Sequence, residues 1–159
     1  MAFDGVTIAN VVYELNKEVI GGRLSKIAQP ENDELLLTIK TQTGQKRLLI
    51  SAGASLPLIY LTEKNKQSPM TAPNFCMLLR KHINNGRIVN ISQPGLERII
   101  QFEIEHLDEL GDLCHKYLIV EIMGKLWLFW LKRGIYIEPL YSQNNWFLPR
   151  CARLKKPEY

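Results

Sequence analysis

The 159-residue sequence predicts an α+β domain, with a mostly antiparallel sheet and two main helices. Three observations support this fold class. Two segments carry apolar residues at helical spacing, several shorter segments are rich in strand-forming residues, and a helix–Gly–strand–Gln-Pro unit occurs twice. The length allows one sizeable core, and the hydrophobic fraction of 46% and charged fraction of 23% are ordinary for a globular protein.

The first half of the chain predicts one helix followed by four strands. The helix has apolar residues along one face and begins near Asp4 or Thr7. It ends at Gly21 and Gly22, because glycine readily adopts the positive φ that stops a helix. Gly44 supplies the same conformation in the turn of a hairpin. In chain order, the expected elements are the helix over 7–20, a strand over 23–29, a hairpin over 34–53 and a strand over 58–62.

The second half predicts another helix, followed by three strands. A polar loop with two prolines comes first, and Pro73 suits the first turn of the helix. Asn85 and Gly86 stop this helix. A turn over 108–112 separates the last two strands. The expected elements are the loop over 64–73, the helix over 74–83 and strands over 87–92, 97–107 and 116–123.

One segment of the sequence is repeated 64 residues later. Residues 22–30 share a Gly-Arg start and a Gln-Pro end with residues 86–94. Packing explains the glycines, the prolines and the inward-pointing isoleucines, since glycine ends a helix and proline ends a strand. Packing alone does not explain the paired arginines, Arg23 and Arg87.

The basic character of the chain is confined to its end. The sequence pI is about 9.0, but seven of the 20 basic and only two of the 16 acidic residues follow Gly124. The first 124 residues therefore carry 13 basic and 14 acidic groups, and any nucleic acid they bind must be held by a local patch. We expect a domain over 1–125 and an atypical basic tail over 126–159. The tail has a candidate strand pair over 126–131 and 134–140, followed by irregular sequence.

No catalytic or metal-binding pattern is present in the sequence. It has no GxSxG, Walker A or GxGxxG motif, and its histidines are isolated. Its three cysteines form no CxxC pair, which indicates reduced thiols in a cytosol. There is no signal peptide and no membrane-spanning stretch. We therefore expect a non-enzymatic, cytoplasmic protein without metal or cofactor. The isolated residues are His82, His106, His115, Cys76, Cys114 and Cys151.

Arg98 is the most informative polar residue. On the predicted strand over 97–107 it shares a face with Ile100 and Phe102, so it is partly buried or lies at a concave edge. Two interpretations remain open: an internal ion pair with Asp4, or a guanidinium fork that binds phosphate. Further basic residues are expected nearby, because helix ends and strand starts meet at the Gly-Arg junctions. This candidate RNA patch comprises Arg23, Lys26, Arg80, Lys81 and Arg87.

Three segments of the chain read MAFDGVTIANVVYELNKEVIGGRLSKIAQP, PNFCMLLRKHINNGRIVNISQPGLERIIQFEI and LGD…KYLIVEIMGK. In sequence, order and spacing these segments closely resemble the NFACT-N domain of the RqcH and NEMF family, also called FbpA or fibronectin-binding protein A-like. The resemblance implies a role in ribosome-associated quality control. Proteins of this family bind obstructed large ribosomal subunits and their rRNA, and they recruit tRNA so that alanine tails are added to the stalled chain.

The resemblance also implies site residues and a fold. The family's tRNA-recruiting Asp-Arg pair maps onto Glu97 and Arg98, and its N-terminal acidic residue maps onto Asp4. Glu97 departs from the family by one methylene. The domain is similar to the N-terminal domain of formamidopyrimidine-DNA glycosylases, but glycosylase activity is not expected, since Ala2 stands where those enzymes need an N-terminal proline.

The basic tail departs from the family pattern, since LWLFWLKRG replaces a segment resembling HSNIIL. This change indicates a frameshifted or truncated product, and sequence divergence is the alternative. A different class of function also remains open. The family's older name suggests a surface adhesin that binds fibronectin or fibrinogen, although the sequence shows no signal peptide or sorting motif for that role.

Overall fold

The computed structural model describes residues 4–51, 57–122, 125–132 and 135–142. All strand pairings in these ranges are antiparallel, which confirms the predicted α+β class with a mostly antiparallel sheet and two helices. The elements are α1 (Gly5–Val19), β1 (Arg23–Ala28), β2 (Glu34–Thr41), β3 (Gly44–Ser51), β4 (Leu58–Thr62), α2 (Asn74–Ile83), β5 (Arg87–Ser92), β6 (Ile99–Leu107), β7 (Leu113–Glu121), β8 (Lys125–Lys132) and β9 (Ile135–Ser142).

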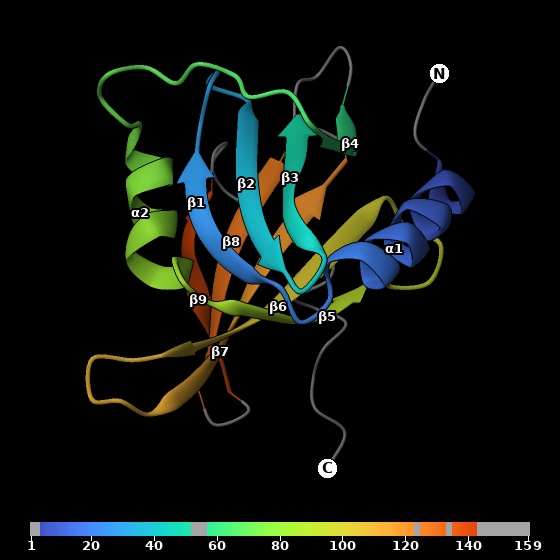
Figure 1. The fold of residues 1–159 in the computed structure, drawn as a ribbon. Coiled ribbons are helices and arrows are strands. Elements are labelled where there is room, and N and C mark those ends of the chain that lie inside the picture. The colour runs from blue at the N-terminus through green and yellow to red at the C-terminus, as the bar shows by residue number, and fades with distance from the viewer. Residues whose placement is uncertain (1–3, 52–56, 123–124, 133–134, 143–159) are drawn as a thin grey trace.

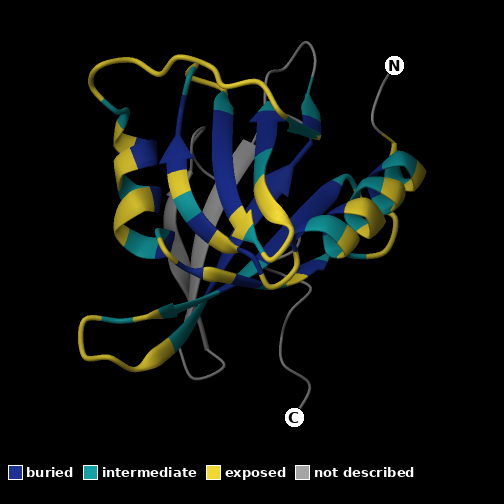
Figure 2. Ribbon diagram, viewed as in Figure 1, coloured by how far each residue is buried: buried dark blue, intermediate teal, exposed yellow. Residues whose placement is uncertain are grey.

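The sheet consists of two halves that meet at β1 and β5. The strand order is β4-β3-β2-β1-β5-β6-β7-β8-β9, so each half is made of the strands that follow one helix. The two helices lie on opposite flanks of the strands (Figure 1). The buried strand residues are dark blue in Figure 2. Most of them form one core with residues from both halves and both helices, including Leu15, Leu37, Ile50, Leu79, Phe102 and Leu118. A separate small cluster consists of Ala28, Leu36 and Leu49.

Each helix packs against the first strand of the other half. The Asn16 side-chain amide on α1 donates a 2.9 Å hydrogen bond to the backbone carbonyl of Ile91 on β5. Sixty-four residues on, Arg80 Nε on α2 donates to the carbonyl of Ile27 on β1, also at 2.9 Å. The repeat in the sequence therefore folds as two related units, and each unit packs its helix against the first strand of the other.

Several element bounds differ from those expected. Helix α1 begins at Gly5 because the Asp4 side chain caps it. Strand β6 begins at Ile99, so Glu97 and Arg98 lie just before the strand and not on it. Strand β7 begins at Leu113, three residues earlier than expected.

The structure has β8 and β9 where the sequence indicates a strand pair, and β8 continues the sheet beside β7. A division of the chain at residue 125 stays a prediction, and residues 143–159 of the basic tail lie outside the described residues. Neither of the two described helices has the length and apolar character needed to cross a membrane.

Candidate nucleic-acid interface

The N-terminus of α1 is capped by the side chain of Asp4. Asp4 Oδ1 accepts a 2.8 Å hydrogen bond from the backbone N–H of Thr7, while the Asp4 carbonyl accepts one from Ile8. The hydrogen bonds from Thr7 lower the pKa of the Asp4 carboxyl. This helix of 15 residues presents the positive end of its dipole at Asp4 and Gly5.

A loop over 93–98 lies directly against this helix end. A Cβ added to Gly5 would overlap the backbone carbonyl of Leu96, so only glycine permits the approach. Gln93 joins the two segments, because its Nε2 donates to the carbonyls of Gly5 at 2.9 Å and Glu97 at 2.8 Å. Asp4 and the Glu97-Arg98 pair are thus brought to the same end of α1, although they are more than 90 residues apart in the sequence.

Arg98 is half-buried at the edge of this loop. Its Nη2 donates to the carbonyl of Ile122 at 2.8 Å, and its own carbonyl accepts from the Ile122 N–H at 2.9 Å. Its Nε is buried and has no hydrogen-bond partner among the described residues. The side chain is therefore anchored by one edge of the guanidinium, and its remaining donors are not used by the described part of the chain.

The expected alternative of an Arg98–Asp4 ion pair is wrong. Among the described residues no ion pair joins these two side chains. The physical reason is that each has another partner: Asp4 caps α1 and Arg98 binds the end of β7.

The Asp4 carboxylate already occupies this helix N-terminus and offsets its partial positive charge. The group that can bind an anion here is therefore the planar guanidinium fork of Arg98, whose geometry matches phosphate oxygens. Glu97 and Leu96 are exposed beside the site, and Leu96 is 68% exposed. An RNA strand at the site would therefore meet a charged and an apolar side chain as well as Arg98.

The candidate RNA patch does not join this site, so the expected proximity is wrong. Arg87 pairs with Glu105 on β6, seven residues beyond Arg98. At the rise of a β-strand this is about 23 Å. Arg23 lies beside Arg87 on β1, and Lys26 follows on the same strand.

The remaining two patch residues lie on the last turn of α2, and Arg80 uses its Nε within the fold. The structure therefore places the side chains of Arg98, Arg23 and Arg87 at two separate sites, one at each end of α1. Arg98 is at the N-terminal end, and Arg23 and Arg87 are at the C-terminal end, where Gly21 lies near the Arg87 guanidinium.

Two residues of the site were not identified from the sequence alone. Gly5 is needed for the close approach of Leu96, and Gln93 holds the loop. The repeat carried a signal for Gln93, because Gln29 occupies the equivalent position and binds the carbonyl of Asn32 in the same way at 2.9 Å. The Gln-Pro element closes a loop in both halves.

The described residues contain no group of three or more His, Cys, Asp or Glu side chains that could hold a metal ion. Cys76 is buried, and burial raises the pKa of its thiol. Burial also lowers the pKa of His82 and of His106, whose Nε2 lies 3.1 Å from the carbonyl of Asn84.

Replacing Asp4 tests the cap. We expect Asp4→Ala to lower the melting temperature at neutral pH, whereas Asp4→Asn retains the cap hydrogen bond and lowers it less. The folded-state pKa of Asp4 is lowered from 3.8. The contribution of its charge is therefore present above about pH 4 and is lost as the pH falls through the folded-state pKa. Thermal melts of wild type and Asp4→Asn should converge at low pH, and a constant difference would contradict a charged cap.

Comparison with known proteins places these observations in a family. Residues 4–128 match the family model described as NFACT N-terminal and middle domains. The chain is 41% identical over 125 residues to the Rqc2 homolog RqcH of Bacillus subtilis, covering 79% of this chain and 22% of that protein. It is 37% identical over 167 aligned positions to the RqcH of Streptococcus suis, covering 99% of this chain and 30% of that protein.

The last alignment extends through the basic tail, whereas the family model ends at residue 128 and the alignment with the Bacillus subtilis protein covers 125 residues. The fold is also similar to the solved N-terminal part of the fibronectin/fibrinogen-binding protein from Streptococcus suis. That match has a TM-score of 0.85 and 30% identity, and it covers 94% of this chain and 56% of the other. The chain spans about a fifth to a third of the length of the two RqcH relatives.

Proposed function

The chain belongs to the family of NFACT N-terminal and middle domains, and on that premise we propose that it is the N-terminal RNA-binding module of a ribosome-associated quality control factor. In this role it binds tRNA and the large ribosomal subunit with its rRNA. It recruits tRNA to obstructed subunits so that alanine is added to the C-terminus of the stalled chain. The identity to RqcH proteins supports the quality-control role.

The single observation that carries the RNA-binding part is the junction of the α1 N-terminus with Arg98. Gln93 ties the helix end to the loop, and Arg98 is fixed beside the loop by the Ile122 carbonyl. The guanidinium of Arg98 attracts phosphate and is held in place before any ligand arrives, so little ordering entropy is lost on binding.

Binding at this site does not require a basic protein. The first 124 residues carry slightly more acidic than basic groups, so the attraction is local and sensitive to salt. In the proposed role this domain makes and breaks no covalent bond. We therefore assign it as a non-catalytic module that acts in the cytoplasm.

Titration of fluorescently labelled tRNA with the 159-residue chain tests this function. We expect saturable binding that weakens steadily as the salt concentration rises. A parallel titration with purified large ribosomal subunits tests the second partner. The proposal is overturned if the chain binds neither tRNA nor large subunits at low salt.

A fibronectin-binding adhesin is the second candidate function. It is supported by the solved structural relative, which is a fibronectin/fibrinogen-binding protein of Streptococcus suis. The chain would then bind immobilised fibronectin with an affinity that tRNA does not change. Binding to fibronectin, together with none to tRNA, would reverse the order of the two functions.

A further inference from the structure

We propose that Arg23 and Arg87 together form a second phosphate-binding site, at the centre of the sheet, for the backbone of the RNA. This inference rests on the proposed function but concerns a different place on the molecule. The Arg98 site lies at the N-terminus of α1 and this pair lies at the other end of that helix, which at 1.5 Å per residue is about 22 Å long.

The two arginines are direct cross-strand neighbours. On the two described strands β1 and β5, the one pair of residues in register consists of Arg23 and Arg87. On either side of it, Leu24 N–H donates to the Gly86 carbonyl and Ile88 N–H donates to the Gly22 carbonyl, both at 2.9 Å. Such a pair is of the non-hydrogen-bonded type, in which the Cα atoms are about 4.5 Å apart and the side chains leave the same face close together.

The backbone on both sides holds the arginines in this position. Gly21 N–H donates to the Ile88 carbonyl and Asn85 N–H donates to the Leu24 carbonyl, both at 2.8 Å. Gly21 has φ +77° and Asn85 has φ +63°, at equivalent positions of the two repeats.

The next residue in each repeat is a glycine in tight contact with the core. A Cβ on Gly22 would lie 2.5 Å from Ile39 Cγ2, and one on Gly86 would lie 2.5 Å from Ile104 Cγ2. Both strands are thus fixed against the core, and the two arginine backbones are not free to separate.

The local charge favours an anion at this place. Lys40 is the neighbour of Arg23 on the other side, so three exposed cations lie in a row across β2, β1 and β5. Glu105 is the direct cross-strand neighbour of Arg87 on β6 and ends the row. Within the described ranges, no ion pair joins Lys40, Arg23 or Arg87 to a carboxylate. Like charges directly opposite each other destabilise a sheet, and an anion between them would reverse that effect.

A phosphate is the anion that fits this pair. Each guanidinium offers a planar set of donors that matches phosphate oxygens, and two such groups can bind one phosphate from both sides. The row of three cations spans about 10 Å across three strands, which is longer than one phosphate. The row therefore fits consecutive phosphates of an RNA backbone better than a single free phosphate.

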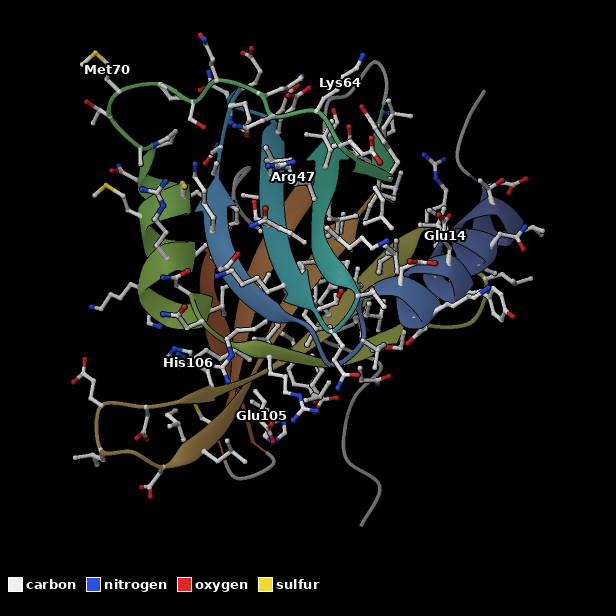
Figure 3. All side chains as sticks on the ribbon, in the orientation of Figure 1. Glu14, Arg47, Lys64, Met70, Glu105 and His106 are labelled. Atoms are coloured by element: carbon white, nitrogen blue, oxygen red, sulfur yellow. The ribbon has the colours of Figure 1, made fainter. Side chains whose placement is uncertain are left out.

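The test compares Arg23→Gln, Arg87→Gln and the double variant with a matched loss of charge, Lys64→Gln. Lys64 is exposed in the loop after β4, at the far end of the sheet (Figure 3). Fluorescence anisotropy with tRNA over a salt series gives the slope of log K against log salt. We expect the double variant to lose about 0.7–0.9 of that slope for each phosphate contact removed, and Lys64→Gln to lose none.

Thermal melting separates binding from a structural role. The substitutions relieve the like-charge contact between Arg23 and Arg87 and also remove the opposite-charge neighbours Arg87 and Glu105, so the double variant should melt close to the wild-type temperature while it binds tRNA less tightly. A lower melting temperature with an unchanged salt slope would assign the pair to the fold and overturn the inference.

The outcomes also distinguish this site from the Arg98 site. If Arg98→Gln weakens tRNA binding and the double variant behaves like Lys64→Gln, this inference fails and the proposed function stands. If the wild-type chain does not bind tRNA, both fail. In the third arm, inorganic phosphate is titrated in place of RNA. Phosphate binding that needs Arg23 and Arg87 but that tRNA does not displace would overturn the RNA assignment.

Discussion

Arg98→Gln is expected to weaken tRNA binding by about 1.5–3 kcal/mol, or roughly 10–150-fold, because it removes charge-assisted hydrogen bonds to phosphate. The side chain is anchored to the Ile122 carbonyl by Nη2, and its Nε is buried, so contact with phosphate would come from the remaining N–H groups of Nη1 and Nη2. Equilibrium titration of labelled tRNA at fixed salt measures the change.

Two controls make this result specific. Arg98→Lys keeps the charge and loses the planar fork, so it should retain the salt dependence and recover only part of the affinity. Both variants lose the side-chain hydrogen bond to the Ile122 carbonyl and keep the backbone hydrogen bond from Ile122 N–H, so the melting temperature should fall by a similar amount in both. Wild-type affinity in Arg98→Gln would remove Arg98 from the site.

Gly5→Ala is expected to destabilise the fold by about 1–3 kcal/mol, because the new methyl group overlaps the Leu96 carbonyl. Alanine is intrinsically the better helix former by about 1 kcal/mol, so a loss of stability would go against helix propensity and identify the contact as its cause. Chemical denaturation measures the free energy of unfolding.

The same variant should also bind tRNA less tightly, since moving α1 away from Leu96 breaks the two hydrogen bonds of Gln93 that join the helix to the loop. Asn10→Ala is the matched control, because Asn10 is exposed on the same helix. If Gly5→Ala is as stable as Asn10→Ala, the close approach of the two segments is not a constraint in solution.

Local sequence patterns were sufficient to predict most of the fold. Helical spacing located α1 and α2 to within two residues. Gly21 follows α1 with the expected positive φ of +77°, whereas after α2 the positive φ belongs to Asn85 and not to Gly86. The repeat of Gly-Arg and Gln-Pro predicted two related units. Periodicity shows which residues of an element share a face, but it does not show which element lies against that face. The exchange of helices between the two halves was therefore not predictable.

The candidate site was predicted only in part, for the same reason. The resemblance to the family pointed to Asp4, Glu97 and Arg98, and the structure brings these residues to one end of α1. The predicted strand began at Glu97, two residues before the observed start of β6 at Ile99, and therefore wrongly included Arg98. The patch residue Arg87 does not lie near Arg98, because Arg98 precedes the start of β6 whereas Arg87 lies opposite Glu105 near its end. This separation depends on the register of β5 with β6, which the sequence pattern does not show.

Site-specific photo-crosslinking tests most directly where the RNA lies. A photoreactive phenylalanine derivative at Leu96, which is 68% exposed beside the α1 N-terminus, is compared with the same group at Tyr60 on β4, which is 44% exposed. We predict that the group at position 96 crosslinks to bound tRNA, that Arg98→Gln abolishes the crosslink, and that the group at position 60 gives none. Equal crosslinking from both positions, or crosslinking from position 60 alone, would contradict an RNA site at the junction of α1 and Arg98.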